Sequence, residues 1–236
     1  MKRALCSIGA GPHAALLALS APTFRAYAER HGYELILSDA ADPSRPPAWA
    51  KIAQLRSLLA RFELVVWIDA DAVVVDASTD IAAELPPDRD LALVRHAYHN
   101  QLVPNTGVMV LRSGAYARGL LERVWDAPDL VEHPWWDNAA LLAALGYRLP
   151  GSLAPGPRGV AHRLARRALG RELRPCAPAH PSDFLAGVHF LGTEWNSIFH
   201  DQAAHPRIVH CLGTPVEQRL RDMRAVLAAA GAGSPD

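Results

Sequence analysis

The run Leu64-Val65-Val66-Trp67-Ile68-Asp69-Ala70-Asp71 indicates the class of the fold. Its first five residues are consecutive strand formers, which is typical of a strand buried on both faces of a parallel sheet. Two carboxylates follow that strand at once. Because ligands of open α/β sheets bind beyond the carboxyl ends of the strands, we expect Asp69 and Asp71 at the edge of a binding cleft.

The segments before this run alternate between strand and helix patterns. We expect strands at residues 3–8 and 33–38, with a helix between them that is interrupted near Pro22 and ends near Gly32. Apolar residues at helical spacing predict an amphipathic helix over residues 49–62. This alternation predicts an α/β fold with a central, mostly parallel sheet flanked by helices.

The second half of the chain continues with shorter elements. Strands are expected at residues 91–95, 107–112, 188–191 and 207–212, and helices at residues 113–125, 134–146 and 216–230. Residues 150–183 are rich in proline, glycine and arginine, and we interpret them as a long irregular region or a flexible lid.

The composition fits a single globular domain. The chain has 236 residues, of which 50% are hydrophobic and 20% charged, and 24 basic and 24 acidic residues give a formal net charge of zero. The lack of a basic excess argues against a broad nucleic-acid surface, and no apolar run reaches the ~18 residues of a transmembrane helix. All but two of the basic residues are arginine, which indicates high-GC coding and a bacterial source, so arginine clusters carry little functional weight.

The cysteines and the N-terminus point to the cytoplasm. Cys6, Cys176 and Cys211 show no paired spacing, so neither a disulfide framework nor a structural zinc site is expected, and reduced thiols are the default. Glycine and proline at Gly9 to Pro12 break the N-terminal apolar run, so no signal peptide is predicted.

The charge of the acid pair needs compensation. Two neighbouring carboxylates repel each other and lose hydration on burial unless a cation or hydrogen-bond donors offset both effects. A divalent metal such as Mg²⁺ or Mn²⁺ is the simplest partner, and it can also bridge a diphosphate. Two acids in a solvated turn remain the alternative without a ligand.

Parts of the sequence match motifs of two enzyme classes, the haloacid-dehalogenase phosphatases and the NAD-dependent enzymes. Asp69-Ala70-Asp71-Ala72-Val73 matches the first motif of haloacid-dehalogenase phosphatases, but the downstream lysine and acidic pair of those enzymes are missing. Gly9-Ala10-Gly11-Pro12-His13-Ala14 matches the dinucleotide-binding pattern in outline. Pro12 would remove a backbone N–H close to the phosphate, and the spacing to Asp39 is long, so an NAD-dependent enzyme is kept as an alternative.

Four further motifs accompany the acid pair. They are Trp49-Ala50-Lys51, Asn105-Thr106-Gly107-Val108-Met109-Val110-Leu111-Arg112, Trp135-Trp136-Asp137-Asn138 and Ile208-Val209-His210-Cys211-Leu212-Gly213. In this order and spacing, over roughly residues 45–145 and 186–215, the chain resembles glycosyltransferase family 34, which includes galactosyl-, xylosyl- and mannosyltransferases. The resemblance implies a Rossmann-like A-type glycosyltransferase fold. It also implies transfer of a sugar from a nucleotide diphosphate sugar, most often a UDP-sugar, to an acceptor hydroxyl with retention.

Residue roles follow from the same resemblance. Asp69 and Asp71 correspond to the DxD metal motif, and His210 would complete a site for Mn²⁺ or Mg²⁺. Asp137 and Asn138 match the catalytic polar pair near the donor sugar, although the family more often has glutamine in the second place. The implied donor-binding residues are Cys6, Ser7, Gly9, Lys51, Asp69, Ala70, Asn105, Thr106, Gly107 and Gly213.

Several of these residues have a structural interpretation as well. Without the acid pair, His210 would be read as a hydrogen-bonded structural histidine, and Asn105 as a left-handed turn residue. Trp135 and Trp136 are either packing anchors or a platform for a sugar. Asn196 precedes the His210 strand as an aromatic-asparagine step does in the family.

The resemblance also implies an organisation and partners. One glycosyltransferase domain would span residues 1–230, with a nucleotide-sugar-binding half at 1–112, an acceptor-side half at 113–230 and a frayed tail at 231–236. The partners would be the nucleotide-sugar donor and a carbohydrate or small-molecule acceptor. Residues 147–185 differ most from the family and are expected to shape the acceptor site. A catalytically silent module that binds sugar nucleotides is the alternative outside the enzymes.

Overall fold

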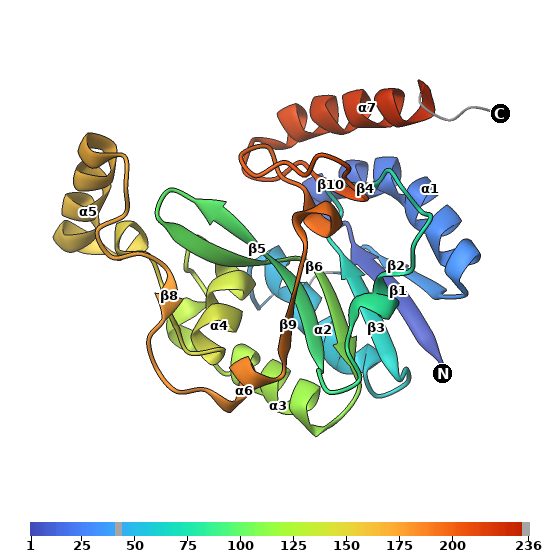
Figure 1. Ribbon diagram of the computed structural model, residues 1–236, viewed down its shortest axis with the longest axis horizontal. Coiled ribbons are helices and arrows are strands. Elements are labelled where there is room, and N and C mark those ends of the chain that lie inside the picture. Colours follow the sequence, from blue (N-terminus) through green and yellow to red (C-terminus); the bar gives the residue numbers. More distant parts are fainter. Residues whose placement is uncertain (41–43, 233–236) are drawn as a thin grey trace.

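The central sheet gives the molecule its frame (Figure 1). The computed structural model describes residues 1–40 and 44–232. Within them six strands form one sheet in the order β2-β1-β3-β6-β5-β9. These strands are β1 (Arg3–Ile8), β2 (Glu34–Ser38), β3 (Leu64–Ile68), β5 (Leu91–Tyr98), β6 (Gln101–Arg112) and β9 (Val188–Leu191).

The sheet is mostly parallel, as predicted. β1 runs parallel to both β2 and β3, and β9 runs parallel to β5. β6 is antiparallel to β3 and to β5, and it forms a hairpin with β5. Both strands of this hairpin are longer than the sequence predicted. The predicted α/β class is therefore confirmed.

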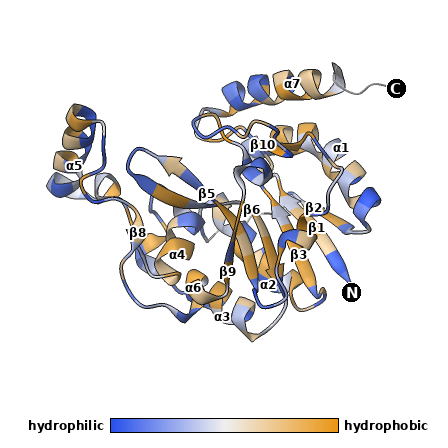
Figure 2. Cartoon of the chain, viewed as in Figure 1, coloured by the Kyte–Doolittle hydropathy of each residue, from blue (hydrophilic) through white to orange (hydrophobic). Residues whose placement is uncertain are grey.

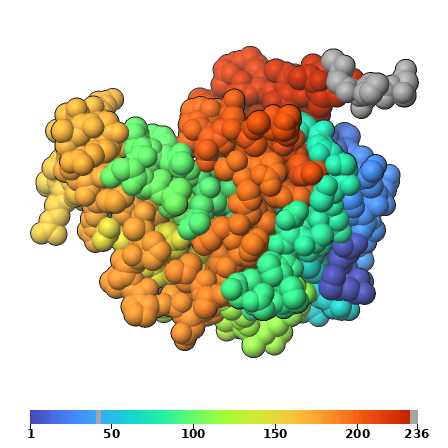
Figure 3. All heavy atoms as spheres, viewed as in Figure 1, coloured from blue at the N-terminus to red at the C-terminus, as the bar shows by residue number. Residues whose placement is uncertain are grey.

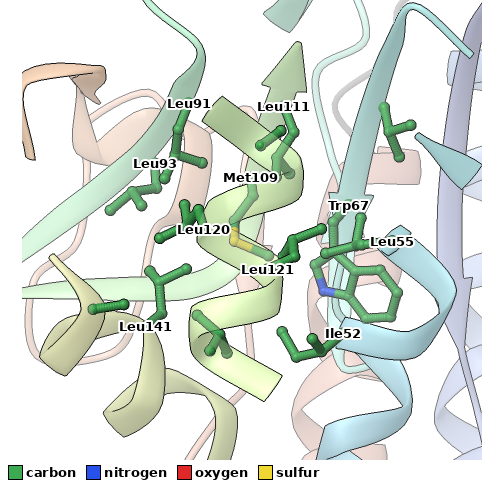
Figure 4. Close-up of a cluster of buried hydrophobic side chains, with 14 of the residues drawn as sticks. Ile52, Leu55, Trp67, Leu91, Leu93, Met109, Leu111, Leu120, Leu121 and Leu141 are labelled. Atoms are coloured by element: carbon green, nitrogen blue, oxygen red, sulfur yellow. The ribbon is translucent and has the colours of Figure 1, made fainter. Parts of the chain in front are cut away.

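Helices cover both faces of the sheet and divide the core in two. One apolar cluster lies with α2 (Ala50–Leu58), α3 (Ala115–Trp125) and α4 (Trp136–Ala144), and Figure 4 shows Met109 of the sheet packed among their leucines. The other cluster lies with α1 (Ala14–His31), which α7 (Val216–Ala232) contacts from outside. Burial of both faces explains the continuous apolar colour of the central strands in Figure 2.

The strand before the acid pair is buried throughout, as the sequence predicts. Val65 and Trp67 of β3 point into one core cluster, and Val66 and Ile68 point into the other. All five residues of β3 are buried. The acid pair therefore follows a strand that is held in position by core packing on both of its faces.

A second, smaller sheet lies just beyond the acid pair. β4 (Ala72–Val74), which the sequence analysis did not predict, pairs antiparallel with β10 (Ile208–His210). In this register His210 stands opposite Ala72. The pairing brings the C-terminal histidine beside carboxylates that are distant in the sequence.

Two local predictions were wrong. α1 continues through Pro22 without a break, because the ring lies on the exposed side while Leu17 and Phe24 anchor the buried side. The helix does end at Gly32, in a left-handed conformation. The helix expected over residues 49–62 is shorter in the structure, where α2 spans Ala50–Leu58.

The region at residues 150–183, which was expected to be irregular, consists largely of secondary structure. Residues 150–183 contain the helix α5 (Gly156–Leu169), which begins at a glycine-proline step and ends before Gly170 in a left-handed conformation. β7 (Tyr147–Arg148) and β8 (Ala177–Pro178) pair on either side of it, and α6 (Asp183–Ala186) follows. The density of proline and arginine hid the helical spacing of the apolar residues inside α5.

Short 3₁₀ helices complete the connections. They are η1 (Gly11–His13), η2 (Pro47–Trp49), η3 (Ile81–Glu84), η4 (Pro128–Leu130), η5 (Gly151–Leu153) and η6 (Thr193–Asn196). Among the described residues, no helix combines the length and the apolar character needed to cross a membrane. Of the expected tail at 231–236, the first two residues belong to α7 and the others lie outside the described residues.

Replacing Pro22 by alanine should raise the free energy of unfolding by roughly 1–3 kcal/mol, because it restores a helical N–H and removes a ring from the helix interior. Thermal or urea unfolding measures the change. Ala26→Gly, on the same exposed side of α1, is the matched control and should lower stability by about 0.5–1 kcal/mol. An unfolding midpoint for Pro22→Ala at or below that of the unaltered protein would contradict this account of α1.

Candidate active site

A cavity of about 700 Å³ opens beyond the carboxyl end of β3. Its walls come from segments that are far apart in the sequence, including η2, the first half of β6, the start of α4 and the loop after β10. Ten of the residues predicted from the sequence line it: Lys51, Asp69, Ala70, Asp71, Asn105, Thr106, Asp137, Asn138, His210 and Gly213. The fold thus gathers most of the predicted site into one place.

Asp69 is held by two donors on one of its oxygens. The indole Nε1 of Trp67 donates to Asp69 Oδ1 at 2.6 Å, and the ammonium of Lys51 lies 3.0 Å from the same oxygen. Asp69 Oδ2 lies 3.8 Å from His210 Nε2. One carboxylate oxygen therefore anchors the side chain, and the other faces the histidine.

Asp71 is compensated by two further cationic groups. His210 Nε2 lies 3.1 Å from Asp71 Oδ1, and the guanidinium of Arg219 donates to Asp71 Oδ2 at 2.8 Å. Burial acts to raise the pKa of Asp71, but the charges and hydrogen bonds of His210 and Arg219 outweigh it and hold that pKa well below its ordinary value. Asp71 is therefore ionised at neutral pH.

A chain of hydrogen bonds fixes the orientation of His210. The N–H of Gly107 donates to Asn105 Oδ1 at 2.8 Å, so that atom is the amide oxygen. The same oxygen accepts from Asn196 Nδ2 at 2.9 Å, which leaves Asn196 Oδ1 facing His210 Nδ1 at 2.9 Å. His210 must then carry its proton on Nδ1, and in the neutral ring the lone pair of Nε2 points at the acid pair.

Gly107 permits this arrangement by its size. A methyl group at position 107 would overlap the imidazole ring of His210. Gly107 was expected to bind the donor, and the structure shows that the group beside it is this imidazole.

Lys51 joins the acid pair to the start of α4. Its ammonium lies 3.1 Å from Asp137 Oδ2 as well as beside Asp69, and it donates to the carbonyl oxygen of Thr106 at 3.1 Å. Burial acts to lower the pKa of Lys51, but the two carboxylates outweigh it and raise that pKa above its ordinary value. Lys51 is a permanent cation shared between two acids.

Asp137 and Asn138 are both tied to Thr106. The hydroxyl of Thr106 donates to Asp137 Oδ2 at 3.1 Å, and its backbone N–H donates to Asn138 Oδ1 at 3.0 Å. Burial raises the pKa of Asp137, although Lys51 opposes the shift. The short amide of Asn138 thus reaches the middle of β6 and positions Thr106 at the cavity wall.

Asp69, Asp71 and His210 present ligand atoms that lie within 4.8 Å of one another. Two carboxylates and one imidazole suit a borderline divalent ion such as Mn²⁺, and they also accommodate Mg²⁺. Because His210 Nδ1 donates to Asn196, the ring binds a metal through the lone pair of Nε2. The donor set therefore fits the predicted metal.

Four predicted donor-binding residues do not line the cavity. Cys6 and Ser7 are fully buried in β1, where the Cys6 thiol donates to the carbonyl of Val66 at 3.5 Å. The N–H of Gly9 donates to the carbonyl of Ser38, and a side chain at position 9 would overlap Leu17. Gly107 lies behind His210, so the structure brings none of the four to the open space.

Three features of the site were not predicted from the sequence. They are the contact of Arg219 with Asp71, the contact of His13 with Arg219, and the hydrogen bond from His210 to Asn196. Arg219 Nη2 lies 3.3 Å from His13 Nε2, which puts the two side chains at one end of the cavity. In a chain rich in arginine no local pattern distinguished Arg219. Asn196 carried a weak signal, because asparagine is rare in this sequence.

Aromatic side chains also line the cavity. They include His96, Tyr98, Trp135, Trp136 and His200, and Trp136 has a positive φ of 39°. Tyr98 and His200 lie with ring centroids 4.8 Å apart. None of residues 147–185, all of which the structure describes, lines this cavity.

His96 is a neutral acceptor in this aromatic part. Its Nδ1 lies 3.2 Å from Asp201 Oδ2, and its buried Nε2 has no hydrogen-bond partner among the described residues. Burial lowers the pKa of His96 to about 4.

Replacing Asn196 by alanine should weaken the binding of Mn²⁺ by about 10–100-fold, because His210 loses the acceptor that fixes its tautomer. Isothermal titration with MnCl₂ measures the change, and circular dichroism checks the fold. Asn196→Asp keeps an acceptor for His210 Nδ1 and should lose less affinity. Equal affinity of Asn196→Ala and the unaltered protein would show that this hydrogen bond does not orient the ligand.

Binding of Mn²⁺ should strengthen as the pH rises. Burial acts to lower the pKa of His210, but Asp71 and Asp69 raise it above its ordinary value of 6.5. A proton on Nε2 therefore competes with the metal, and affinity should rise by about tenfold per pH unit while the metal-free ring is protonated. Titrations between about pH 6 and pH 8 test the slope. An affinity that does not change with pH would mean that His210 is no ligand.

Part of the chain is similar to a known protein family. Residues 14–95 match the profile of the galactosyl transferase GMA12/MNN10 family, and the matched part contains Lys51, Asp69 and Asp71. A search of curated proteins found no match.

Solved structures share the fold. A glycosyltransferase involved in the glycosylation of the major capsid of PBCV-1 superimposes with a TM-score of 0.61 at 16% identity, over 95% of this chain and 100% of that chain. The glycosyltransferase GlyE of Streptococcus pneumoniae TIGR4 gives a TM-score of 0.52 at 13% identity, over 97% of this chain and 63% of that chain, so this chain spans less than two thirds of GlyE. The A-type fold predicted from the sequence is confirmed. The match over residues 14–95 agrees with the resemblance to this family that the sequence motifs indicate.

Proposed function

We propose that this protein transfers a sugar from a UDP-sugar to an acceptor hydroxyl, with the help of a divalent metal and with retention of the anomeric configuration. The observation that carries the proposal is the convergence of Asp69, Asp71 and His210 beside Lys51 in one cavity of a glycosyltransferase fold. The family match supports the reaction class, and the donor set supports the metal.

Mn²⁺ is the proposed metal, with Mg²⁺ as its substitute. Asp69, Asp71 and His210 would hold it. When bound, the ion would neutralise the charge that develops on the diphosphate as it leaves.

The chain's own cations would add to that effect. Lys51 lies beside Asp69, and Arg219 lies beside Asp71, so each is within a few ångströms of the proposed diphosphate position. Preorganised cations in a partly buried cavity stabilise developing negative charge more than exposed ones do, because little water screens them. Arg219 would exchange its contact with Asp71 for one with phosphate.

Asp137 and Asn138 are the proposed catalytic pair. Asp137 is held as a carboxylate by Lys51 and by the hydroxyl of Thr106, and it lines the cavity. A fixed carboxylate can stabilise positive charge on the anomeric carbon, or attack it to form a covalent intermediate. Asn138 would set the position of Thr106 and so of the sugar pocket.

The lining of the cavity suggests a division between donor and acceptor. The donor would bind to Lys51, Asp69, Ala70, Asn105, Thr106 and Gly213. The acceptor would bind to the aromatic side chains of Tyr98, Trp136 and His200, because aromatic faces stack on the apolar faces of sugar rings. There the free Nε2 of His96 could accept a hydrogen bond from an acceptor hydroxyl. We propose that residues 1–112 supply most of the donor half of a single domain over 1–230, and that residues 113–230 complete the acceptor half.

The thiols support a place in the cytoplasm. Cys6, Cys176 and Cys211 are free, and two of them are buried. Reduced cysteines are typical of that compartment.

A thermal-shift titration with UDP, GDP and NAD⁺, each with and without Mn²⁺, tests the proposed donor. A ligand at 100 times its dissociation constant adds about 2.7 kcal/mol to stability, which is readily seen. A shift with UDP that requires Mn²⁺ is expected. A shift with NAD⁺ alone, without metal, would overturn the proposal, and donor binding without any product would leave a catalytically silent module.

Replacing Asp71 by asparagine should reduce turnover of a UDP-sugar by at least 10²-fold with little loss of secondary structure, because it removes a metal ligand. Release of UDP in the presence of Mn²⁺ measures turnover. Asp88→Asn, at an exposed acid that pairs with Arg89 on the surface, is the control and should keep full activity. Full turnover by Asp71→Asn would rule out its metal role.

A further inference from the structure

The helix α5 stands apart from the body of the molecule (Figures 1 and 3). Its neighbours are the loop at η5 and the chain that leads to β8. Two hydrogen bonds between Asn100, at the tip of the β5–β6 hairpin, and the backbone of Glu172 connect this projection to the sheet. The projection is thus a defined part of the fold.

The amphipathic character of α5 is inverted. The side that faces the protein carries Gly159, which is buried, and His162 and Arg166, which are half-buried. Arg163 is exposed, but its Nη1 donates to the carbonyl of Ser152 at 2.9 Å. Its apolar side faces outward, where Val160, Leu164 and Ala168 follow one another at a spacing of four residues. Helices of globular proteins normally bury such a stripe, so this one lacks its partner.

The exposed apolar area extends past the end of the helix. Leu164 is 60% exposed, Leu169 55% and Leu173 50%, and these are among the most exposed large apolar side chains of the described residues. Figure 2 shows apolar and polar colours side by side on α5. Leu169 follows Leu164 by five residues, so helical geometry puts it on a different side of α5 from the stripe. The projection therefore exposes apolar side chains both on the stripe and beyond it, and exposed apolar side chains gathered in this way mark a site of interaction.

The charges around this surface are all of one sign. Between residues 150 and 180 the sequence contains six arginines, Arg158, Arg163, Arg166, Arg167, Arg171 and Arg174. The single acid in this segment, Glu172, is buried and accepts from the N–H of Ser152. Helical spacing puts Arg158 and Arg167 on opposite borders of the apolar stripe, and both are exposed.

We propose that α5, together with Leu169 and Leu173, binds the surface of an anionic lipid bilayer. A projecting helix can lie flat in the plane of the headgroups with its apolar side buried about 5–10 Å deep. Flanking arginines can bury their stems and reach lipid phosphates with their guanidinium groups. A second copy of the chain would bring the same positive charges against these arginines, which disfavours self-association through this face.

Co-sedimentation with vesicles tests the proposal. The unaltered protein should pellet with vesicles of equal parts phosphatidylcholine and phosphatidylglycerol. It should bind vesicles of phosphatidylcholine alone at least tenfold more weakly, and high salt should weaken the anionic binding. No binding to the anionic vesicles would overturn the proposal.

Three variants test the apolar and the electrostatic contributions to vesicle binding. Leu164→Glu should weaken binding to the anionic vesicles by at least tenfold. Arg158→Ala and Arg167→Ala should each weaken it by about fivefold, since a basic residue near an anionic surface contributes about 1 kcal/mol. Ala26→Glu and Arg25→Ala, both exposed on α1, are the matched controls and should bind as the unaltered protein does.

Analytical ultracentrifugation tests the alternative, in which a second copy of the chain covers the apolar side of α5. The unaltered protein should remain a monomer at concentrations at which it binds vesicles. A dimer that Leu164→Glu abolishes, together with equal vesicle binding by both proteins, would assign the apolar face to self-association and overturn the proposal. The test does not depend on the sugar transfer proposed above, because it measures no turnover.

Discussion

The site depends on the mutual compensation of three carboxylates and three cations. Asp69, Asp71 and Asp137 face one cavity, where their charges would otherwise repel. Lys51 lies between Asp69 and Asp137, while His210 and Arg219 both contact Asp71. These contacts join α2, β3, α4, β10 and α7, so one set of ion pairs holds together segments from both ends of the chain.

The same compensation prepares the cavity for ligands. Asp69 keeps one oxygen on Lys51 and Trp67 and turns the other toward His210. Asn196 accepts from His210 Nδ1, so Nε2 is the atom that can bind a metal once it has lost its proton. Such supporting hydrogen bonds determine the geometry of a metal site as much as the ligands themselves do. Gly107 contributes only by lacking a side chain, which leaves room for the imidazole.

Much of this could be predicted from the sequence, and the exceptions have physical causes. The buried strand β3 with the acids at its end carries a strong local pattern, and its central place in the sheet follows from burial on both faces. His210 could be connected to that pair only through family resemblance, because the β4–β10 pairing that brings them together joins residues about 140 apart. Arg219 gave no local signal, and the expected break at Pro22 did not occur because tertiary packing overrides the local preference. The expected loop at α5 was wrong for another reason: the density of proline, glycine and arginine around it hid the helical spacing of Val160, Leu164 and Ala168.

The most direct measurement is anomalous diffraction from crystals grown with UDP and Mn²⁺. The account predicts one strong manganese peak among Asp69, Asp71 Oδ1 and His210 Nε2, with the diphosphate beside Lys51 and Arg219 turned away from Asp71. A peak elsewhere, or UDP bound in this cavity without any metal while Arg219 still pairs with Asp71, would contradict it.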